Sequence, residues 1–116
     1  IVGWEVGGAG VDYKSTYWRA ADGDWSVDLS LLSAGTLSQI ISALVVGETY
    51  EVTFELSGNP DAGGGLRSVS VNATNGGTAQ TYAAAGVSLA DMNWQTHTYT
   101  FTATATSSVL SFASLE

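Results

Sequence analysis

The chain of 116 residues contains no cysteine, one proline and only three basic residues. Without cysteine it can form neither a disulfide framework nor a zinc site built from thiolates. Lys and Arg total 3 against 11 Asp and Glu, which gives a formal net charge of -8, whereas nucleic acids are bound by clustered basic side chains. No apolar run approaches the roughly 18 residues that a membrane span requires. We therefore expect no nucleic-acid partner and no membrane insertion.

Alternation of apolar and polar residues is the main structural pattern of the chain. In residues 49–57, Tyr50, Val52 and Phe54 alternate with polar residues, which is typical of a half-buried strand. Many such segments, separated by Gly-rich turns, predict a single all-β domain over residues 1–116, an antiparallel two-sheet β-sandwich of the jelly-roll type. About nine strands are expected, at Trp4–Val6, Tyr17–Ala20, Trp25–Leu29, Thr36–Ile41, Thr49–Ser57, Leu66–Thr74, Thr78–Ala84, Trp94–Ala103 and Ser108–Ser114.

Two local signals refine this prediction. Asn75-Gly76 follows an alternating segment and indicates a hairpin. Residues 38–46 are almost continuously apolar, which would suit a helix or a buried strand. Their β-branched content and the flanking Gly35 and Gly47 favour the buried strand.

Residues 12–28 bring aromatic rings and carboxylates together, as a sugar-binding site requires. Trp25 alternates with Val27 and Leu29 and is predicted to be core, whereas Trp4 and Trp94 flank strand starts and are predicted to cap the sandwich. The loop of residues 58–65 adds polar groups, although its Asn-Pro-Asp sequence also suits a simple turn. The candidate ligand-binding residues are Tyr17, Trp18, Asp22, Asp24, Asn59, Asp61 and Arg67.

The same acidic stretch offers a candidate calcium site, because hard cations take several carboxylate and carbonyl oxygens. The ligands would be Asp12, Asp22, Asp24 and Asp28. Their spacing is incomplete in comparison with known calcium loops, so solvated acidic turns are the alternative.

No catalytic set is predicted, and we expect the protein not to be an enzyme. Glu51 and Glu55 share one face of a strand about 13 Å apart, which exceeds the roughly 5 to 9.5 Å of a glycosidase carboxylate pair. His97 is the only histidine and shares a strand face with Tyr99 and Phe101, which predicts packing rather than general-base catalysis.

Four segments in order carry a resemblance to a known family. They are the run from Gly3-Trp4 through VDYKSTYWRAADGDWSVDLS, the GTLSQ at residues 35–39, the GETYEVTFELSGNPDAG from Gly47, and the Met-x-Trp that precedes YTFTA in residues 92–103. Together they resemble the galactose-binding-like domain of bacterial choice-of-anchor C proteins and related plant cell-wall proteins. The resemblance implies a secreted or surface-displayed β-sandwich related to carbohydrate-binding modules, with no catalytic residues to carry over.

The chain departs from this family at its C-terminal end. There the strand that resembles residues 109–114 is normally followed by another strand, whereas this sequence stops at Leu115-Glu116. We expect either a truncated domain or a sheet that is completed in another way, and an exposed sheet edge is a template for strand addition. Two functions therefore stay open: a non-catalytic extracellular module that binds polysaccharide, and a structural surface or matrix protein whose copies assemble into filaments through sheet edges.

Overall fold

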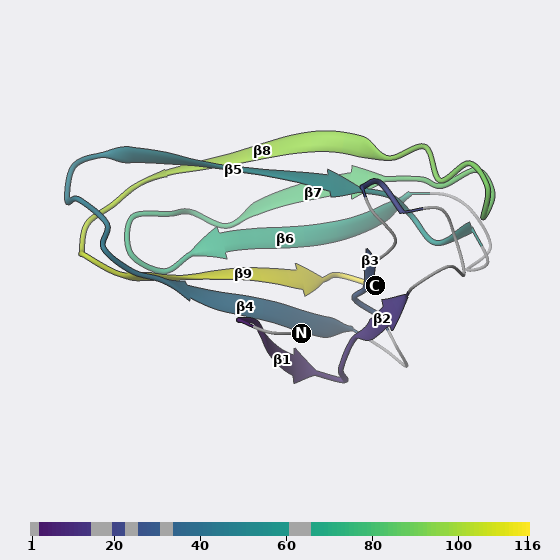
Figure 1. Ribbon diagram of the computed structural model, residues 1–116, viewed down its shortest axis with the longest axis horizontal. Coiled ribbons are helices and arrows are strands. Elements are labelled where there is room, and N and C mark those ends of the chain that lie inside the picture. The colour runs from purple at the N-terminus through teal and green to yellow at the C-terminus, as the bar shows by residue number, and fades with distance from the viewer. Residues whose placement is uncertain (1–2, 15–19, 23–25, 31–33, 61–65) are drawn as a thin grey trace.

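The computed structural model describes residues 3–14, 20–22, 26–30, 34–60 and 66–116. Within these ranges the regular structure is entirely β, and every strand pairing is antiparallel (Figure 1). The strands are β1 (Glu5–Gly8), β2 (Asp12–Lys14), β3 (Ser26–Asp28), β4 (Gly35–Ile41), β5 (Thr49–Leu56), β6 (Arg67–Ala73), β7 (Gln80–Ala84), β8 (Gln95–Thr102) and β9 (Ser108–Ser114).

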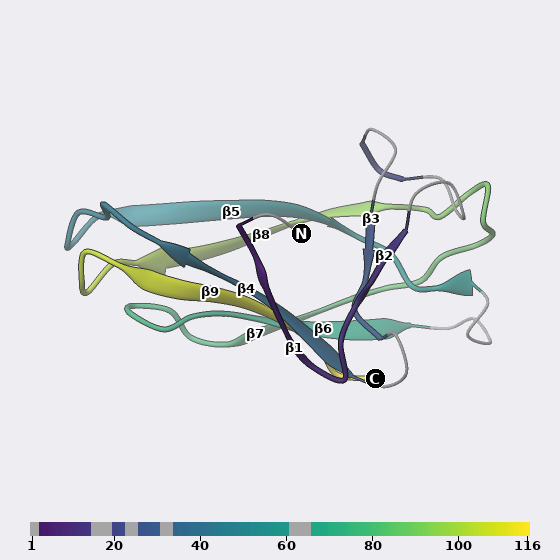
Figure 2. The same ribbon diagram turned by 60° about the horizontal axis from the view of Figure 1, so that its bottom comes forward.

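The strands form two layers of unequal width. One layer is a five-stranded sheet in the order β1-β4-β9-β6-β7, and the pair β5-β8 packs against its inner face. The short pair β2-β3 runs across the direction of the long strands near one end of the sandwich (Figure 2). This arrangement confirms the predicted antiparallel β-sandwich.

Most predicted strands are found within a few residues of their expected limits. The expected strand at Trp4–Val6 is found as β1, shifted towards Gly8. The expected strand at Tyr17–Ala20 lies outside the described residues except for Ala20, which belongs to no strand. Sequence reasoning missed β2, because its three residues are too few to show an alternating pattern.

The strand β5 shows how alternation sets the two faces of a layer. It pairs with β8 along its whole length, from Thr49 opposite Thr102 to Leu56 opposite Gln95. Every second residue of β5, beginning with Tyr50, is half-buried and faces the other sheet, while the residues between them are exposed. The outward face therefore carries Thr and Glu, and Glu55 accepts a hydrogen bond of 2.7 Å from the Thr96 hydroxyl.

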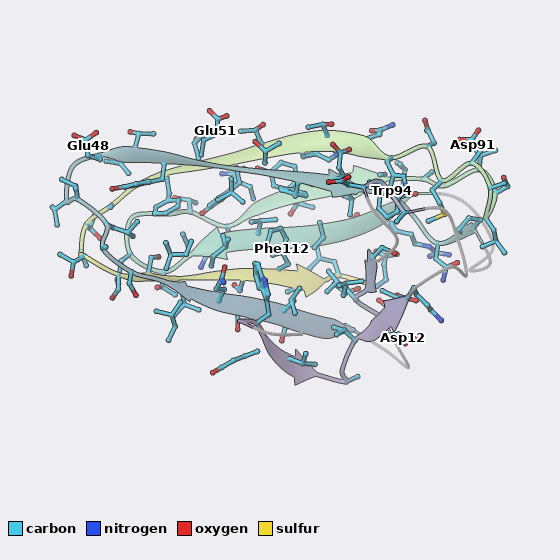
Figure 3. All side chains as sticks on the ribbon, viewed as in Figure 1. Asp12, Glu48, Glu51, Asp91, Trp94 and Phe112 are labelled. Carbon is cyan, nitrogen blue, oxygen red and sulfur yellow. The ribbon has the colours of Figure 1, made fainter. Side chains whose placement is uncertain are left out.

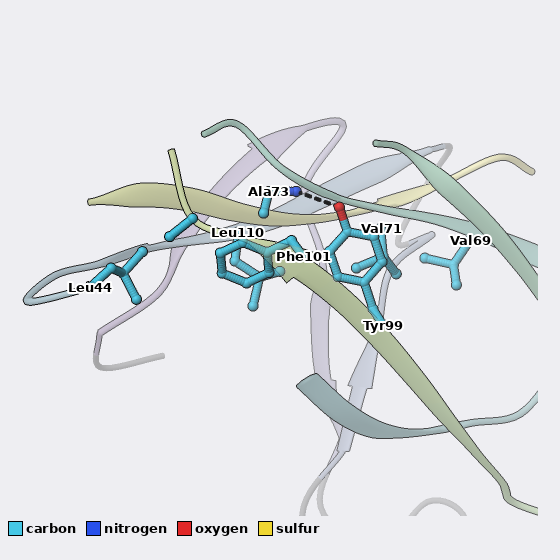
Figure 4. Close-up of a cluster of buried hydrophobic side chains, with 8 residues drawn as sticks. Leu44, Val69, Val71, Ala73, Tyr99, Phe101 and Leu110 are labelled. Carbon is cyan, nitrogen blue, oxygen red and sulfur yellow. Dashed lines mark hydrogen bonds between the residues drawn. The ribbon is translucent and has the colours of Figure 1, made fainter. Parts of the chain in front are cut away.

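The core lies where β8 covers β6. Val71 and Ala73 of β6 are fully buried, and Tyr99 of β8 is 1% exposed. The Tyr99 hydroxyl accepts a hydrogen bond from the Ala73 N–H at 3.0 Å (Figure 4). It donates one to the Thr78 carbonyl, also at 3.0 Å. This hydroxyl satisfies backbone groups in the opposite layer, so Tyr99 links the two sheets by polar contacts as well as by packing.

The predicted hairpin at Asn75-Gly76 is confirmed, since β6 and β7 pair with Val71 opposite Gln80. Gly76 has a φ of 111°, and a Cβ there would lie 1.9 Å from the Thr102 carbonyl oxygen. Only glycine fits this conformation and this close approach.

The apolar run of residues 38–46 is a strand only as far as Ile41. The chain then turns through Ala43, whose φ is 57°, and Leu44 is buried with its N–H donated to the Thr106 carbonyl at 2.9 Å. Val45 and Val46 are more than half exposed. The preference for strand over helix is therefore confirmed, but the prediction of burial fails: within the strand residues 38, 39 and 41 are half-buried and Ile40 is 66% exposed, and beyond it only Leu44 is buried.

Candidate functional site

The two sheets and the short strand β3 enclose a partly open cavity of about 910 Å³. The residues that line the cavity fall into two groups, an apolar one between the sheets and a polar one near the ends of the strands. The trough is the apolar part between the sheets, lined by Trp4, Leu37, Val52, Phe54 and Phe112. The loop end is the polar part where strands end or begin, lined by Asp22, Asn59, Arg67, Trp94 and Glu116.

The antiparallel pairing of the strands explains why the residues of the loop end lie close together. The end of β5 meets the start of β8, and Val69, near the start of β6, lies opposite Ser114 at the end of β9. The segments that follow or precede these strands therefore converge. Figure 3 shows Trp94 and Asp91 at this end of the sandwich, Glu48 at the opposite end and Phe112 between the sheets.

Arg67 and Glu116 form the charged part of the loop end. Their side chains form an ion pair of 3.3 Å, and the second Glu116 oxygen accepts the Ser68 N–H at 3.3 Å. The Leu115 N–H donates to the Ser68 carbonyl at 3.1 Å. These bonds fix the end of β9 against the start of β6, and they hold the guanidinium at the cavity.

Asn59 is positioned by a close backbone contact. Gly58 is buried, and a Cβ there would lie 2.8 Å from the Ala84 carbonyl oxygen at the end of β7. The neighbouring Ser57 hydroxyl donates to the Met92 carbonyl. The segment after β5 is thus held between the end of β7 and the segment before β8, and Asn59 comes directly after this fixed point.

Trp94 is half-buried and directly precedes β8. The preceding Asn93 has a φ of 52°, and its N–H donates to Asp91 Oδ1 at 3.2 Å. The Asp91 N–H is in turn bonded to the Ser88 carbonyl at 3.1 Å. The hydrogen-bonded turn of residues 88–93 therefore orients the start of β8 so that the Trp94 indole lines the cavity.

The charge at the cavity is strongly negative. Among the described residues that line it, the carboxylates belong to Asp22, Asp28, Glu51, Glu55 and Glu116, and the only cationic side chain is Arg67. Arg67 is already paired with Glu116. The arrangement therefore disfavours an anionic ligand.

The sequence-predicted ligand residues are partly brought together. Asp22, Asn59 and Arg67 come from three separate segments and line the same cavity. The predictions for Tyr17, Trp18, Asp24 and Asp61, and the core prediction for Trp25, lie outside the described residues.

Trp94 and Glu116 are the two residues of the loop end that sequence reasoning did not select, and Trp94 is the aromatic one. Trp94 lies half-buried directly before β8. It was expected to be a structural cap, yet it shares the cavity with the three predicted residues. The sequence signal that could have identified Trp94 was its position directly before an alternating strand, the one that pairs with β5.

The three described residues of the predicted calcium site, Asp12, Asp22 and Asp28, do not by themselves form a metal site. Asp12 and Asp28 are opposite residues of β2 and β3, but Asp12 pairs with Lys14 at 2.7 Å and Asp28 accepts the Ser30 N–H at 3.0 Å. No group of three or more His, Cys, Asp or Glu among the described residues can hold a metal ion. Asp24 lies outside them, so calcium binding stays a prediction.

His97 occupies the packed position expected from its strand face. Its ring lies 5.2 Å from that of Tyr82 and 5.8 Å from that of Phe54. Tyr82 closes this side of the sandwich, because its hydroxyl donates to the Thr98 carbonyl at 3.0 Å. Partial burial raises the pKa of the Tyr82 phenol above its ordinary value, and the neighbouring Tyr99 adds to the rise.

Comparison with known proteins identifies a family, one relative over part of the chain and one structural neighbour. The family described as "Protein of unknown function (DUF642)" matches residues 1–116. Halomucin of Haloquadratum walsbyi is 39% identical over 59 residues, which are 51% of this chain and 1% of that protein. The enzymatically active domain of tailspike protein 4 of bacteriophage CBA120 has a TM-score of 0.55 at 11% identity, over 97% of this chain and 17% of the tailspike chain.

These matches confirm part of the resemblance inferred from the sequence. The family match supports a galactose-binding-like domain related to plant cell-wall proteins, and the tailspike likeness supports the β fold. The narrower assignment to choice-of-anchor C proteins stays a prediction. This chain spans only a small part of halomucin and of the tailspike chain. No helix among the described residues is long and apolar enough to cross a membrane.

Proposed function

We propose that this chain, which belongs to the DUF642 family, is a non-catalytic extracellular domain that binds polysaccharide at the loop end of its cavity. One observation carries the proposal. Asp22, Asn59 and Arg67, selected from sequence as sugar ligands, converge with Trp94 from four separate segments. The family's association with plant cell walls supports a location at the cell surface or outside the cell.

The chemistry of the loop end suits a pyranose ring. A sugar presents an apolar face of C–H groups, which an indole such as Trp94 can cover. Its hydroxyls need donors and acceptors in fixed places, which the amide of Asn59 and the carboxylate of Asp22 provide. A mainly apolar cavity with a few convergent polar groups is the usual form of a small-ligand site.

The charge of the cavity narrows the glycan to a neutral one. The carboxylates around it outnumber the single guanidinium, and the whole chain carries a formal charge of -8. Uronate-rich or sulfated chains would meet repulsion at the cavity and over the whole surface. Neutral galactans, glucans and mannans therefore form the class to be tested.

Affinity electrophoresis through gels that contain neutral polysaccharides tests the proposal. We expect retardation by at least one of them, and a loss of about tenfold or more in affinity for Trp94→Ala, which corresponds to ~1.4 kcal/mol. Trp94→Phe keeps an aromatic face and should bind within about threefold of the parent protein. Gln80→Ala, an exposed change on β7, is the matched control.

Two results would contradict the proposal. One is that no neutral polysaccharide of a panel including galactan, xyloglucan, β-glucan and mannan retards the parent protein. The other is that Trp94→Ala, with an unchanged melting temperature, binds as the parent protein does.

A further inference from the structure

The inner face of the five-stranded sheet becomes progressively more exposed towards β1. One row of facing residues crosses the sheet from Val71 through Phe112 and Leu37 to Val6. Val71 is fully buried, Phe112 and Leu37 are half-buried, and Val6 is 50% exposed. The pair β5-β8 is too narrow to cover this face, so its apolar side chains on β4 and β1 remain accessible.

The smaller sheet shows the same gradient in the same direction. On β8, Tyr99 and Phe101 are buried, whereas on β5 the facing Val52 and Tyr50 are only half-buried. The open side of the sandwich is therefore bounded by β5 and floored by β4, and residues of both strands line the trough. Residues 26–28 of β3, the short strand that crosses near one end of the sandwich (Figure 2), also line the cavity.

The outer edge of β5 has no strand partner among the described residues, since β5 pairs only with β8. An edge strand presents N–H and C=O groups that can pair with a further strand. A strand added there would lie over the exposed inner face of β4 and β1. It would satisfy an unpaired edge and cover an apolar floor at the same time.

The existing partner of β5 indicates which side chains such a strand needs. On the inward side, β8 places Tyr99 and Phe101 next to Val52 and Tyr50. On the outward side, threonines of β8 lie opposite the glutamates, and Thr96 donates to Glu55. A second neighbour of β5 would meet the same exposed glutamates, Glu51 and Glu55, across the strand.

We propose that the trough and the outer edge of β5 accept a β-strand from a partner polypeptide, with apolar residues inward alternating with Lys, Arg or Thr outward. Opposite charges on facing residues stabilise a strand pair, and like charges destabilise it. A second copy of this chain fits poorly, because each copy carries a charge of -8 and no segment of it has basic residues at alternate positions. The occupant is therefore a basic or hydroxyl-rich strand of another protein, rather than a second copy as in the filament alternative left open by the sequence.

This interaction surface is separate from the proposed glycan site. The strand would run along residues 49–56, and the glycan residues lie beyond the end of β5. Failure of either proposal leaves the other unaffected.

A synthetic peptide of alternating pattern tests the proposal against the whole chain. The probe is Lys-Val-Thr-Val-Lys-Val-Thr-Val-Lys, which matches β5 in length and has valines on one face. Its controls are the peptide with Glu in place of Lys and a scrambled peptide without alternation. Binding is measured by titration calorimetry, and amide hydrogen exchange locates the site.

We expect saturable binding of the basic peptide, at least tenfold tighter than that of the acidic peptide, with new protection of the amides of β5. Exchanging both Glu51 and Glu55 for Gln should reduce the preference for the basic peptide to less than threefold, because Gln keeps the shape and removes the charge. Asp91→Asn removes one carboxylate at the loop end, away from Glu51 (Figure 3), and should leave the preference unchanged.

Four results would overturn the proposal. Three of them are failure of the basic peptide to bind, equal binding of the scrambled peptide, and no protection of the β5 amides when the peptide is bound. Concentration-dependent protection of β5 without peptide would also overturn it, because the occupant would then be a second copy.

Discussion

The Tyr99 hydroxyl is expected to contribute about 2 to 3 kcal/mol to the stability on which both proposed surfaces depend. Tyr99→Phe removes one oxygen and leaves the ring in place. The Ala73 N–H then loses its partner inside a fully buried position, and an unpaired buried group costs about 1 to 3 kcal/mol. The Thr78 carbonyl also loses a bond, but Thr78 is exposed, so water replaces most of that contribution.

Thermal and urea unfolding of Tyr99→Phe measure this cost. For a chain of 116 residues, 1 kcal/mol corresponds to about 4 °C in melting temperature, so we expect a decrease of about 8 to 12 °C. Tyr50→Phe is the matched control, because the Tyr50 hydroxyl accepts the Val45 N–H at 2.8 Å in an exposed position. It should cost about 1 kcal/mol or less. A Tyr99→Phe loss no larger than that of Tyr50→Phe would refute the buried bridge between the sheets.

Three further predictions concern pH, the hairpin and the ligand. The pKa of the Tyr82 phenol is raised in the folded protein, so the stability that the neutral phenol contributes is complete below its ordinary pKa of about 10. This stability is lost as the pH rises through the pKa of the folded state. Urea unfolding from pH 8 to 11 should therefore show a smaller loss of stability at alkaline pH for Tyr82→Phe than for the parent protein. Gly76→Ala should lower stability by about 2 kcal/mol or more, measured by urea unfolding, because the φ of 111° strains alanine and the new Cβ meets the Thr102 carbonyl. Oligogalacturonate should bind at least tenfold more weakly than the best neutral glycan in calorimetry, and Asp22→Asn should narrow that difference.

The strands were largely predictable because their residues carry the required information locally. In β5 and β6 the alternation of apolar and polar residues alone predicts which side chains face the core, and Val71 and Ala73 are fully buried as expected. Gly76 likewise marks its hairpin through its own backbone freedom. Residues 38–46 show the limit of such reasoning. Leu44 is buried and Val45 exposed in a turn that is bonded to the Thr106 carbonyl, which is distant in sequence.

The site was less predictable because it depends on which strand ends meet. Asn59 and Arg67 could be selected by residue type, but their convergence with Trp94 follows from the pairing of β5 with β8 and of β6 with β9. Those pairings join residues that are far apart in sequence. The alternation of apolar and polar residues also does not show how many strands each sheet contains. It therefore could not predict that a sheet of five strands packs against a pair, which leaves Phe112 only half-buried.

The unequal width of the two sheets leads to a last prediction that separates the two surfaces. Loops close over the cavity only where strands end, so Trp94 and Arg67 lie at that end while Glu51 lies along the open edge. Trp94→Ala should therefore weaken glycan binding and leave the affinity for the basic peptide within about twofold, and Glu51→Gln should do the reverse. Calorimetry with each variant and both ligands measures this. If one substitution weakened both ligands by similar factors, the cavity would act as a single site, and the division into loop end and trough would be wrong.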